Sequence, residues 1–221
     1  MQRVALITGA SGGIGRSISK TLSDAGHDLI LIGRNTERLS LLKSDIANNK
    51  SNTVIETHSC DVSQSTQVSA LMEGLQQRNL TLSVLVNAAG VSGGGITAEV
   101  DDQLWLTVIN TNLNGTFFVT REALRLGLIP KGGRIINIAS TGGKQGVIHG
   151  APYCASKHGM IGLTKALGLE LARNGSGITV NAVCPGFVET EMAERVRTHY
   201  ARLWGVDEAE ARRRIEVSRA E

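Results

Sequence analysis

Val4-Ala5-Leu6-Ile7-Thr8-Gly9-Ala10-Ser11-Gly12-Gly13-Ile14-Gly15 is the stretch that decides the fold. Its first four residues form a short apolar run that favours a β-strand, and a helical pattern begins after Gly15. The turn between them is rich in glycine, which lets the backbone approach an anion closely. The start of a helix offers free N–H groups at the positive end of its dipole. The stretch therefore predicts a strand, a diphosphate-binding turn and a helix.

The same alternation of apolar runs and helical patterns continues along the chain. Strands are predicted over Arg3–Thr8, Asp28–Gly33, Thr53–Ser59, Ser83–Asn87, Gly133–Ala139 and Gly177–Val183. Helices are predicted over Gly13–Ala25, Thr36–Asn48, Ser63–Arg78, Asp101–Leu126, Pro152–Arg173 and Glu189–Arg202. This pattern predicts one α/β domain over residues 1–221, with a doubly wound parallel sheet (Rossmann fold) and helices on both faces. Ligands bind such sheets beyond the carboxyl ends of the strands.

Composition excludes several classes of protein. The 221 residues are 41% hydrophobic, which suits one domain with a substantial core. The net charge of +3 is dispersed, so no basic face for nucleic acid is expected. No apolar run reaches the roughly eighteen residues of a membrane helix, and Met1 leads almost directly into the first strand without room for a signal peptide. With three cysteines and no metal-type Cys/His spacing, we expect a cytoplasmic protein with reduced thiols and no metal.

Three side chains form a candidate proton-transfer site. Tyr153 and Lys157 lie four residues apart in Y-C-A-S-K, which places them on one face of a helix. A free tyrosine has a pKa of about 10, and a nearby cation lowers it. Ser140 ends an apolar run, where its hydroxyl can hold a substrate oxygen. Together these groups could exchange a proton at a carbonyl or alcohol while a nicotinamide exchanges a hydride.

These motifs, in this order and spacing, resemble the short-chain dehydrogenase/reductase family over nearly the whole chain. The glycine motif is Thr8–Gly15, and the family's N-N-A-G is present as Asn87-Ala88-Ala89-Gly90 with its second Asn replaced. The active-site tetrad falls on Asn112, Ser140, Tyr153 and Lys157, and the late P-G motif on Pro185-Gly186. The resemblance implies a distortion of the helix around Asn112 that holds a water for a proton relay. The alternative for this residue is a solvent-facing asparagine.

The resemblance also implies a nucleotide site. Asp61 and Val62 would frame the adenine, Asn87 and Gly90 would line the next part of the groove, and Thr190 would meet the nicotinamide amide. The complete expected set of cofactor-binding residues is Gly9, Ser11, Gly13, Ile14, Gly15, Arg34, Asp61, Val62, Asn87, Gly90, Tyr153, Lys157, Pro185, Gly186, Val188 and Thr190.

The choice of cofactor depends on the end of the second predicted strand. An acid at that place would accept hydrogen bonds from the ribose diol of NAD. This chain has Gly33 followed by Arg34, and a guanidinium suits a 2′-phosphate. The sequence therefore predicts NADP(H), and the alternative is that Arg34 is an ordinary solvated residue at a helix start.

Within the family, the chain most resembles ketoreductases of aromatic (type II) polyketide synthases and 3-oxoacyl-thioester reductases. The resemblance rests on Ser140–Val147, Ala151–Tyr153, Thr164–Ala172 and Val183–Thr190. Ser92-Gly93-Gly94 takes the place of a Pro-Gly-Gly element linked to polyketide orientation. The implied substrate-binding residues are Gly93, Gly94, Gln145 and His149.

The implied reaction is NADPH-dependent reduction of a ketone to a secondary alcohol. The substrate would be a polyketide or 3-oxoacyl carbonyl, free or carried on an acyl carrier protein. One alternative is a reductase of a free small ketone, an aromatic polyol or a steroid. Another, of a different class, is a non-catalytic NADP-binding protein.

The resemblance implies further features of the whole molecule. Residues 189–216 would form a segment that covers the substrate, with Tyr200 and Trp204 available to line the pocket. Family members continue to a last strand, so we expect that strand to be missing here and apolar surface to be exposed beside the sixth strand. The long helices after the fourth and fifth strands, including Trp105 and Leu106, would pair with a second subunit in a homodimer or homotetramer.

Overall fold

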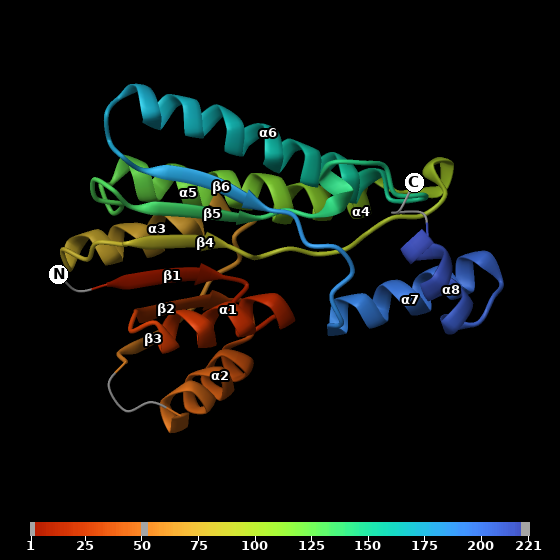
Figure 1. Cartoon of the computed structure of the whole chain (residues 1–221), viewed down its shortest axis with the longest axis horizontal. Helices are drawn as coiled ribbons and strands as arrows, with labels where there is room; N and C mark the ends of the chain where they lie inside the picture. Colours follow the sequence, from red (N-terminus) through yellow and green to blue (C-terminus); the bar gives the residue numbers. More distant parts are fainter. Residues whose placement is uncertain (1–2, 50–52, 218–221) are drawn as a thin grey trace.

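The computed structural model describes residues 3–49 and 53–217 and confirms the predicted α/β architecture (Figure 1). Its six strands pair in parallel in the order β3-β2-β1-β4-β5-β6. The order reverses between β1 and β4, which opens a crevice beyond their carboxyl ends. The strands are β1 (Val4–Thr8), β2 (Asp28–Gly33), β3 (Ile55–Ser59), β4 (Val84–Asn87), β5 (Arg134–Ile138) and β6 (Thr179–Val183).

Helices cover both faces of the sheet. On one face lie α1 (Gly13–Asp24) and α2 (Thr36–Asn49), against β1 to β3. The other face carries α3 (Ser65–Gln77), α5 (Gly115–Arg125) and α6 (Ala151–Arg173), with α4 (Asp102–Ile109) beside α6. Beyond the carboxyl ends of the strands, α7 (Glu191–Trp204) packs against α8 (Glu208–Val217) (Figure 1). Short turns of 3-10 helix are η1 (Thr97–Glu99) and η3 (Thr141–Gly143).

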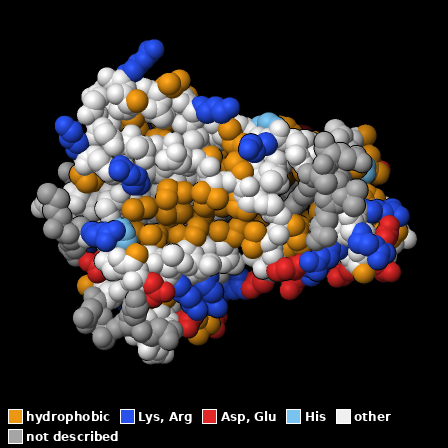
Figure 2. All heavy atoms as spheres, viewed as in Figure 1, with side chains coloured by type: hydrophobic (Ala, Val, Ile, Leu, Met, Phe, Trp, Pro, Cys, Tyr) orange, Lys and Arg blue, Asp and Glu red, His pale blue; other side chains and the backbone are white. Residues whose placement is uncertain are grey.

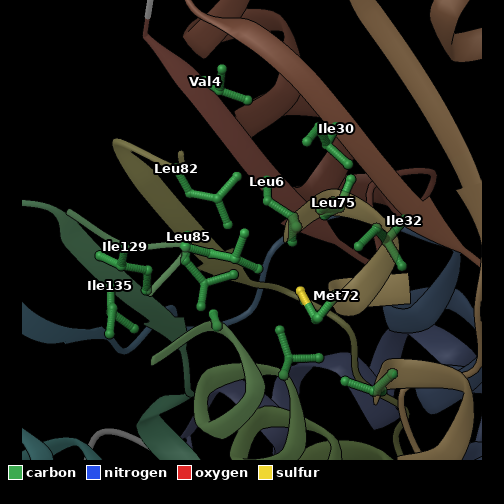
Figure 3. Close-up of a cluster of buried hydrophobic side chains, with 14 of the residues drawn as sticks. Val4, Leu6, Ile30, Ile32, Met72, Leu75, Leu82, Leu85, Ile129 and Ile135 are labelled. Carbon is green, nitrogen blue, oxygen red and sulfur yellow. The ribbon is translucent and has the colours of Figure 1, made fainter. Parts of the chain in front are cut away.

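Alternation along the strands builds the two halves of the core. In β1, Val4 and Leu6 face one side while Ala5 and Ile7 face the other, because side chains alternate in a strand. The Leu6 side contains Met72 and Leu75 of α3, as Figure 3 shows. All of these side chains are almost completely buried, so the core packs closely against both faces of β1.

The second face is covered unevenly. Its cluster joins β1 and β2 to α1 and α2, but Val84 and Ile136 at its margin are only partly buried. Figure 2 shows hydrophobic side chains gathered across the middle of this view. Among the described residues no strand pairs with the outer side of β6, so β6 forms the edge of their sheet, with Val183 49% exposed.

Several elements differ from those predicted. The single helix expected over Asp101–Leu126 is α4, a π-helical turn η2 (Asn110–Asn114) and α5. The helix expected from Ser63 begins at Ser65, because the Asp61 side chain accepts hydrogen bonds from the Ser63 backbone and hydroxyl and holds a turn there.

Helix α8 was not predicted as an element. Gly205 ends α7 in the left-handed region with φ +62°, and Asp207 then accepts a hydrogen bond from the Glu210 backbone N–H at 2.7 Å. Glycine followed by a capping aspartate is a detectable signal for a helix end and a new helix start.

None of the described helices has the length and apolar character needed to cross a bilayer. In residues 3–49 and 53–217, no group of three or more His, Cys, Asp or Glu side chains could hold a metal ion. None of the cysteines in the described residues forms a disulfide bond, and burial raises the pKa of the Cys60 thiol to about 11.

Candidate active site

The turn after β1 requires glycine at two close approaches. Gly9 has φ +62°, and a Cβ there would lie 2.6 Å from Ala89 Cα. A Cβ on Gly15 would lie 2.2 Å from the Gly9 carbonyl oxygen. The Thr8 hydroxyl accepts hydrogen bonds from the backbone N–H groups of Ala88 and Ala89, both at 3.1 Å. The turn after β1 and the loop after β4 are thereby joined at the crevice.

A groove of about 380 Å³ extends from this turn along the carboxyl ends of the strands. Twelve residues of the expected cofactor set line it: Gly9, Ser11, Gly13, Ile14, Gly15, Arg34, Asp61, Val62, Gly90, Tyr153, Lys157 and Thr190. Arg34 is 64% exposed and lies 3.9 Å from Asp61, a loose ion pair that leaves the guanidinium accessible. The start of α7 closes one side, because Thr190 packs where a side chain on Gly13 would project.

The other four expected cofactor residues lie elsewhere. Asn87 is 1% exposed, and its amide donates to Thr120 Oγ1 at 3.0 Å and Asn137 Oδ1 at 2.9 Å. Its side chain thus ties β4 to β5 and α5 beneath the groove. Pro185, Gly186 and Val188 line a second cavity rather than the groove.

The candidate proton-transfer groups meet where β5 ends and α6 begins. Lys157 is 5% exposed, and its ammonium donates to the Ile138 carbonyl at 2.8 Å and lies 5.8 Å from the Tyr153 ring centroid. Burial lowers the pKa of Lys157 to about 8, which leaves it mainly cationic at neutral pH. Ser140, 5% exposed, follows β5, and its hydroxyl accepts from the Gly142 N–H at 3.1 Å.

Asn112 lies in the π-helical turn and is completely buried. Its Oδ1 accepts from the Val91 N–H at 2.8 Å, and its Nδ2 donates to the Val91 carbonyl and to Ser156 Oγ, both at 3.0 Å. The side chain therefore joins the loop after β4 to α6, and the alternative of a solvent-facing asparagine is wrong. Asn112's own carbonyl accepts from the Thr116 hydroxyl at 2.8 Å.

A second cavity, of about 420 Å³, adjoins the groove and is covered by α7 and α8. Its walls are largely apolar, with Leu104, Val147, Phe187, Met192, Val196, Tyr200 and Ile215 among them. Ser140 opens into this cavity and Lys157 into the groove, while Tyr153 lines both. A substrate oxygen in the cavity and a cofactor in the groove could therefore both reach Tyr153.

The family model described as short chain dehydrogenase matches residues 3–201. The chain belongs to the short-chain dehydrogenase family.

Two similar proteins and one similar solved structure are ketone-reducing members of this family by name. A Streptomyces violaceoruber protein named "Granaticin polyketide synthase putative ketoacyl reductase 1" is 55% identical over 214 residues, 96% of this chain and 77% of that protein. A 3-oxoacyl-(acyl-carrier-protein) reductase of Rickettsia typhi is 38% identical over 194 residues, 88% of this chain and 76% of that protein. The crystal structure of an actinorhodin polyketide ketoreductase with NADPH has a TM-score of 0.86 and 49% identity, and the match covers 95% of this chain and 80% of that one.

The groove of this short-chain dehydrogenase fits a nicotinamide dinucleotide. The backbone approaches at Gly9 and Gly15 leave no room for side chains, and the turn opens directly into the start of α1. Such a turn presents N–H groups to a diphosphate. Arg34 offers a cation at the end of β2, where the sequence predicts a 2′-phosphate.

The residues expected to contact substrate divide into two pairs. Gly93 and Gly94 line the second cavity, whereas Gln145 and His149 are not among its lining residues. A Cβ on Gly94 would lie 2.1 Å from the His149 carbonyl oxygen, and the Gly95 N–H donates to that same oxygen at 2.8 Å. Gly94 therefore lines the cavity, and backbone packing against His149 requires a glycine at this position.

Sequence reasoning missed most of the wall formed by α7. Tyr200 was expected to line the pocket and does, with its hydroxyl donating to the Ile148 carbonyl at 2.8 Å. Trp204 instead packs on Tyr200, with ring centroids 4.7 Å apart. Met192, Val196 and His199 also line the cavity, and their helical spacing from Tyr200 was the available signal.

Proposed function

We propose that this short-chain dehydrogenase reduces a ketone to a secondary alcohol with NADPH, acting on a polyketide or 3-oxoacyl substrate. The observation that carries the proposal is the position of Tyr153 on the wall shared by groove and cavity, with Lys157 on one side and Ser140 on the other. A non-catalytic NADP-binding protein would have no need of this arrangement.

In this proposal, NADPH supplies the hydride that the carbonyl carbon accepts. Ser140 and the Tyr153 hydroxyl donate hydrogen bonds to the carbonyl oxygen and stabilise the negative charge that develops there. Tyr153 then gives its proton to that oxygen as general acid. The buried Lys157 cation stabilises the phenolate that remains. Asn112 bonds to Val91 in the loop after β4 and to Ser156 on α6, and so fixes the positions of these two segments around the reacting groups.

The shape and chemistry of the second cavity support a bulky, mainly apolar substrate. A volume of about 420 Å³ is within the usual range for a small-molecule site. Its apolar walls suit cyclised polyketide rings. The names of the granaticin and actinorhodin relatives support the polyketide class, and that of the Rickettsia relative supports a carrier-bound 3-oxoacyl group.

The test compares two ketones under identical conditions. Oxidation of NADPH is followed with a bicyclic decalone and with an acetoacetyl thioester, using Tyr153→Phe as the chemically matched control. We expect a higher kcat/KM for the decalone. A strong preference for the thioester would reassign the substrate to the 3-oxoacyl class, and no turnover of any ketone by the wild type would overturn the proposed reaction.

We also propose that the enzyme acts as a homo-oligomer whose subunits pair through α4, α5 and α6. The support is exposed apolar surface on these helices, where Trp105 is 41%, Phe117 41% and Leu169 68% exposed. Light scattering on the purified protein tests this, and a monomer would refute it.

A further inference from the structure

An ion pair bridges the two walls of the cofactor groove. Arg38 lies in the first turns of α2, and Glu191 is the first residue of α7, 153 positions later in the chain. Their side chains are hydrogen-bonded, and both line the groove together with Arg34. Thr190, beside Glu191, packs over Gly13 at the start of α1. The pair therefore ties the helix that covers the substrate cavity to the arginine-bearing end of the groove.

Glu191 is the counter-ion of several cations at this place. Its carboxylate lies 3.8 Å from Arg195 on the same helix as well as being bonded to Arg38. The hydrogen bond from Arg38 holds the pKa of Glu191 below its usual range, and the charges of Arg38, Arg195 and Arg16 lower it further. The carboxylate is therefore ionised at neutral pH and occupies a position that another anion could take.

The pair is weak enough to exchange partners. Arg38 is 48% and Glu191 59% exposed, and ion pairs exposed to water contribute little to stability. A phosphate dianion accepts stronger, charge-assisted and often bidentate hydrogen bonds from a guanidinium. Arg34, loosely paired with Asp61, already supplies one such group on the same wall.

We propose that Arg38 is a second ligand of the cofactor 2′-phosphate and that Glu191 is its intramolecular competitor. The pair works as a latch, in which a cofactor bearing the 2′-phosphate draws Arg38 from Glu191 and frees the start of α7. A cofactor without that phosphate leaves the latch closed. This inference rests on the proposed use of NADPH and adds a residue pair that sets cofactor selectivity and links it to the cover of the substrate cavity.

Binding measurements on the intact protein test the latch without any turnover. Dissociation constants for NADPH and NADH are measured by titration calorimetry for the wild type, Arg38→Gln and Glu191→Gln. We expect Arg38→Gln to weaken NADPH binding by about tenfold or more. Glu191→Gln should tighten it by about three- to fivefold, the scale of an exposed ion pair. The dissociation constant for NADH should stay within about twofold in both variants.

Matched variants separate the latch from general charge effects. Glu194→Gln removes the same charge in the first turn of α7, and Lys43→Gln removes a cation from α2, but neither residue lines the groove. Both control variants should leave the ratio of the NADPH and NADH dissociation constants unchanged. A merely structural role for Arg38 or Glu191 would change both cofactors equally.

A second measurement follows the release of α7. Adenosine 2′,5′-bisphosphate should speed hydrogen exchange in the first turn of α7, whereas adenosine 5′-monophosphate should not. Two results would overturn the latch while leaving NADPH use intact. One is equal hydrogen exchange in α7 with both nucleotides, and the other is a ratio of NADPH to NADH dissociation constants that stays unchanged in Arg38→Gln and Glu191→Gln. A wild type that binds NADH as tightly as NADPH would overturn both the latch and the proposed cofactor.

Discussion

Replacing Asn112 by alanine should destabilise the whole domain in addition to lowering activity. The side chain is fully buried and makes three hydrogen bonds, two of them to the Val91 backbone. Ser156 would keep a bond, because its hydroxyl also donates to the Tyr153 carbonyl at 2.7 Å. The Val91 N–H and carbonyl would both lose their side-chain partner, at about 1–3 kcal/mol each where buried. Val91 is half-buried and water can reach part of it, so we expect a total loss of about 2–4 kcal/mol.

The assay is denaturant and thermal unfolding of the purified variants beside the wild type. For a domain of this size, each kcal/mol shifts Tm by about 2–4 °C, so the variant should melt roughly 5–15 °C lower. Asn114→Ala is the matched control in the same π-helical turn, since the Asn114 amide donates to Asn110 Oδ1, and it should cost about 1 kcal/mol or less. An inactive Asn112→Ala protein with wild-type stability would refute this reasoning and leave Asn112 only the role of holding a water.

Three further outcomes test the chemistry. Tyr153→Phe should lose at least 99% of turnover, because a general acid contributes on the order of a hundredfold or more to the rate. Its dissociation constant for NADPH should stay near that of the wild type. A variant that keeps one tenth of normal turnover would exclude Tyr153 as the essential acid. Because burial lowers the pKa of Lys157 to about 8, the cation is present below that pH and is lost above it. NADPH affinity measured by fluorescence titration should therefore fall between about pH 7 and pH 9, and a Lys157→Ala protein should show no such fall. Arg34→Ala should weaken NADPH binding by about 1.5–3 kcal/mol and barely affect NADH, as the loss of a bond to a charged group predicts; equal losses would place Arg34 in folding or in diphosphate binding.

Features that depend on local spacing could be predicted from the sequence. The alternation in β1 puts Leu6 and Ile7 on opposite faces, and the glycine turn follows at once, so strand, turn and helix are all encoded within a few residues. The four-residue spacing of Tyr153 and Lys157 likewise depends only on helix geometry. For this reason the parallel sheet and the glycine motif were expected where the structure has them.

Contacts between distant segments could not be predicted in the same way. Gly94 is a glycine because the His149 carbonyl lies against it, and no local pattern in either segment carries that information. Asn87 stands at the end of a strand beside the groove, yet its side chain turns into the buried network with Asn137 on the neighbouring strand. The pairing of Arg38 with Glu191 depends on how α7 returns over the sheet, which the spacing of either helix does not determine.

The polar contacts of the site form one connected path from Val91 to Tyr153, so we expect Asn112 to affect Tyr153, the proposed acid, without touching substrate. Val91 is held by Asn112, Asn112 donates to Ser156, and Ser156 donates to the carbonyl of Tyr153. A shift of the loop after β4 is thus transmitted to the first turn of α6, where Tyr153 stands between groove and cavity. A misplacement of the acid lowers the rate of proton transfer more than it weakens binding, since the bonds to the developing charge depend on position. The π-helical turn is what brings Asn112 into this path, because it interrupts the regular helix where the side chain meets both partners.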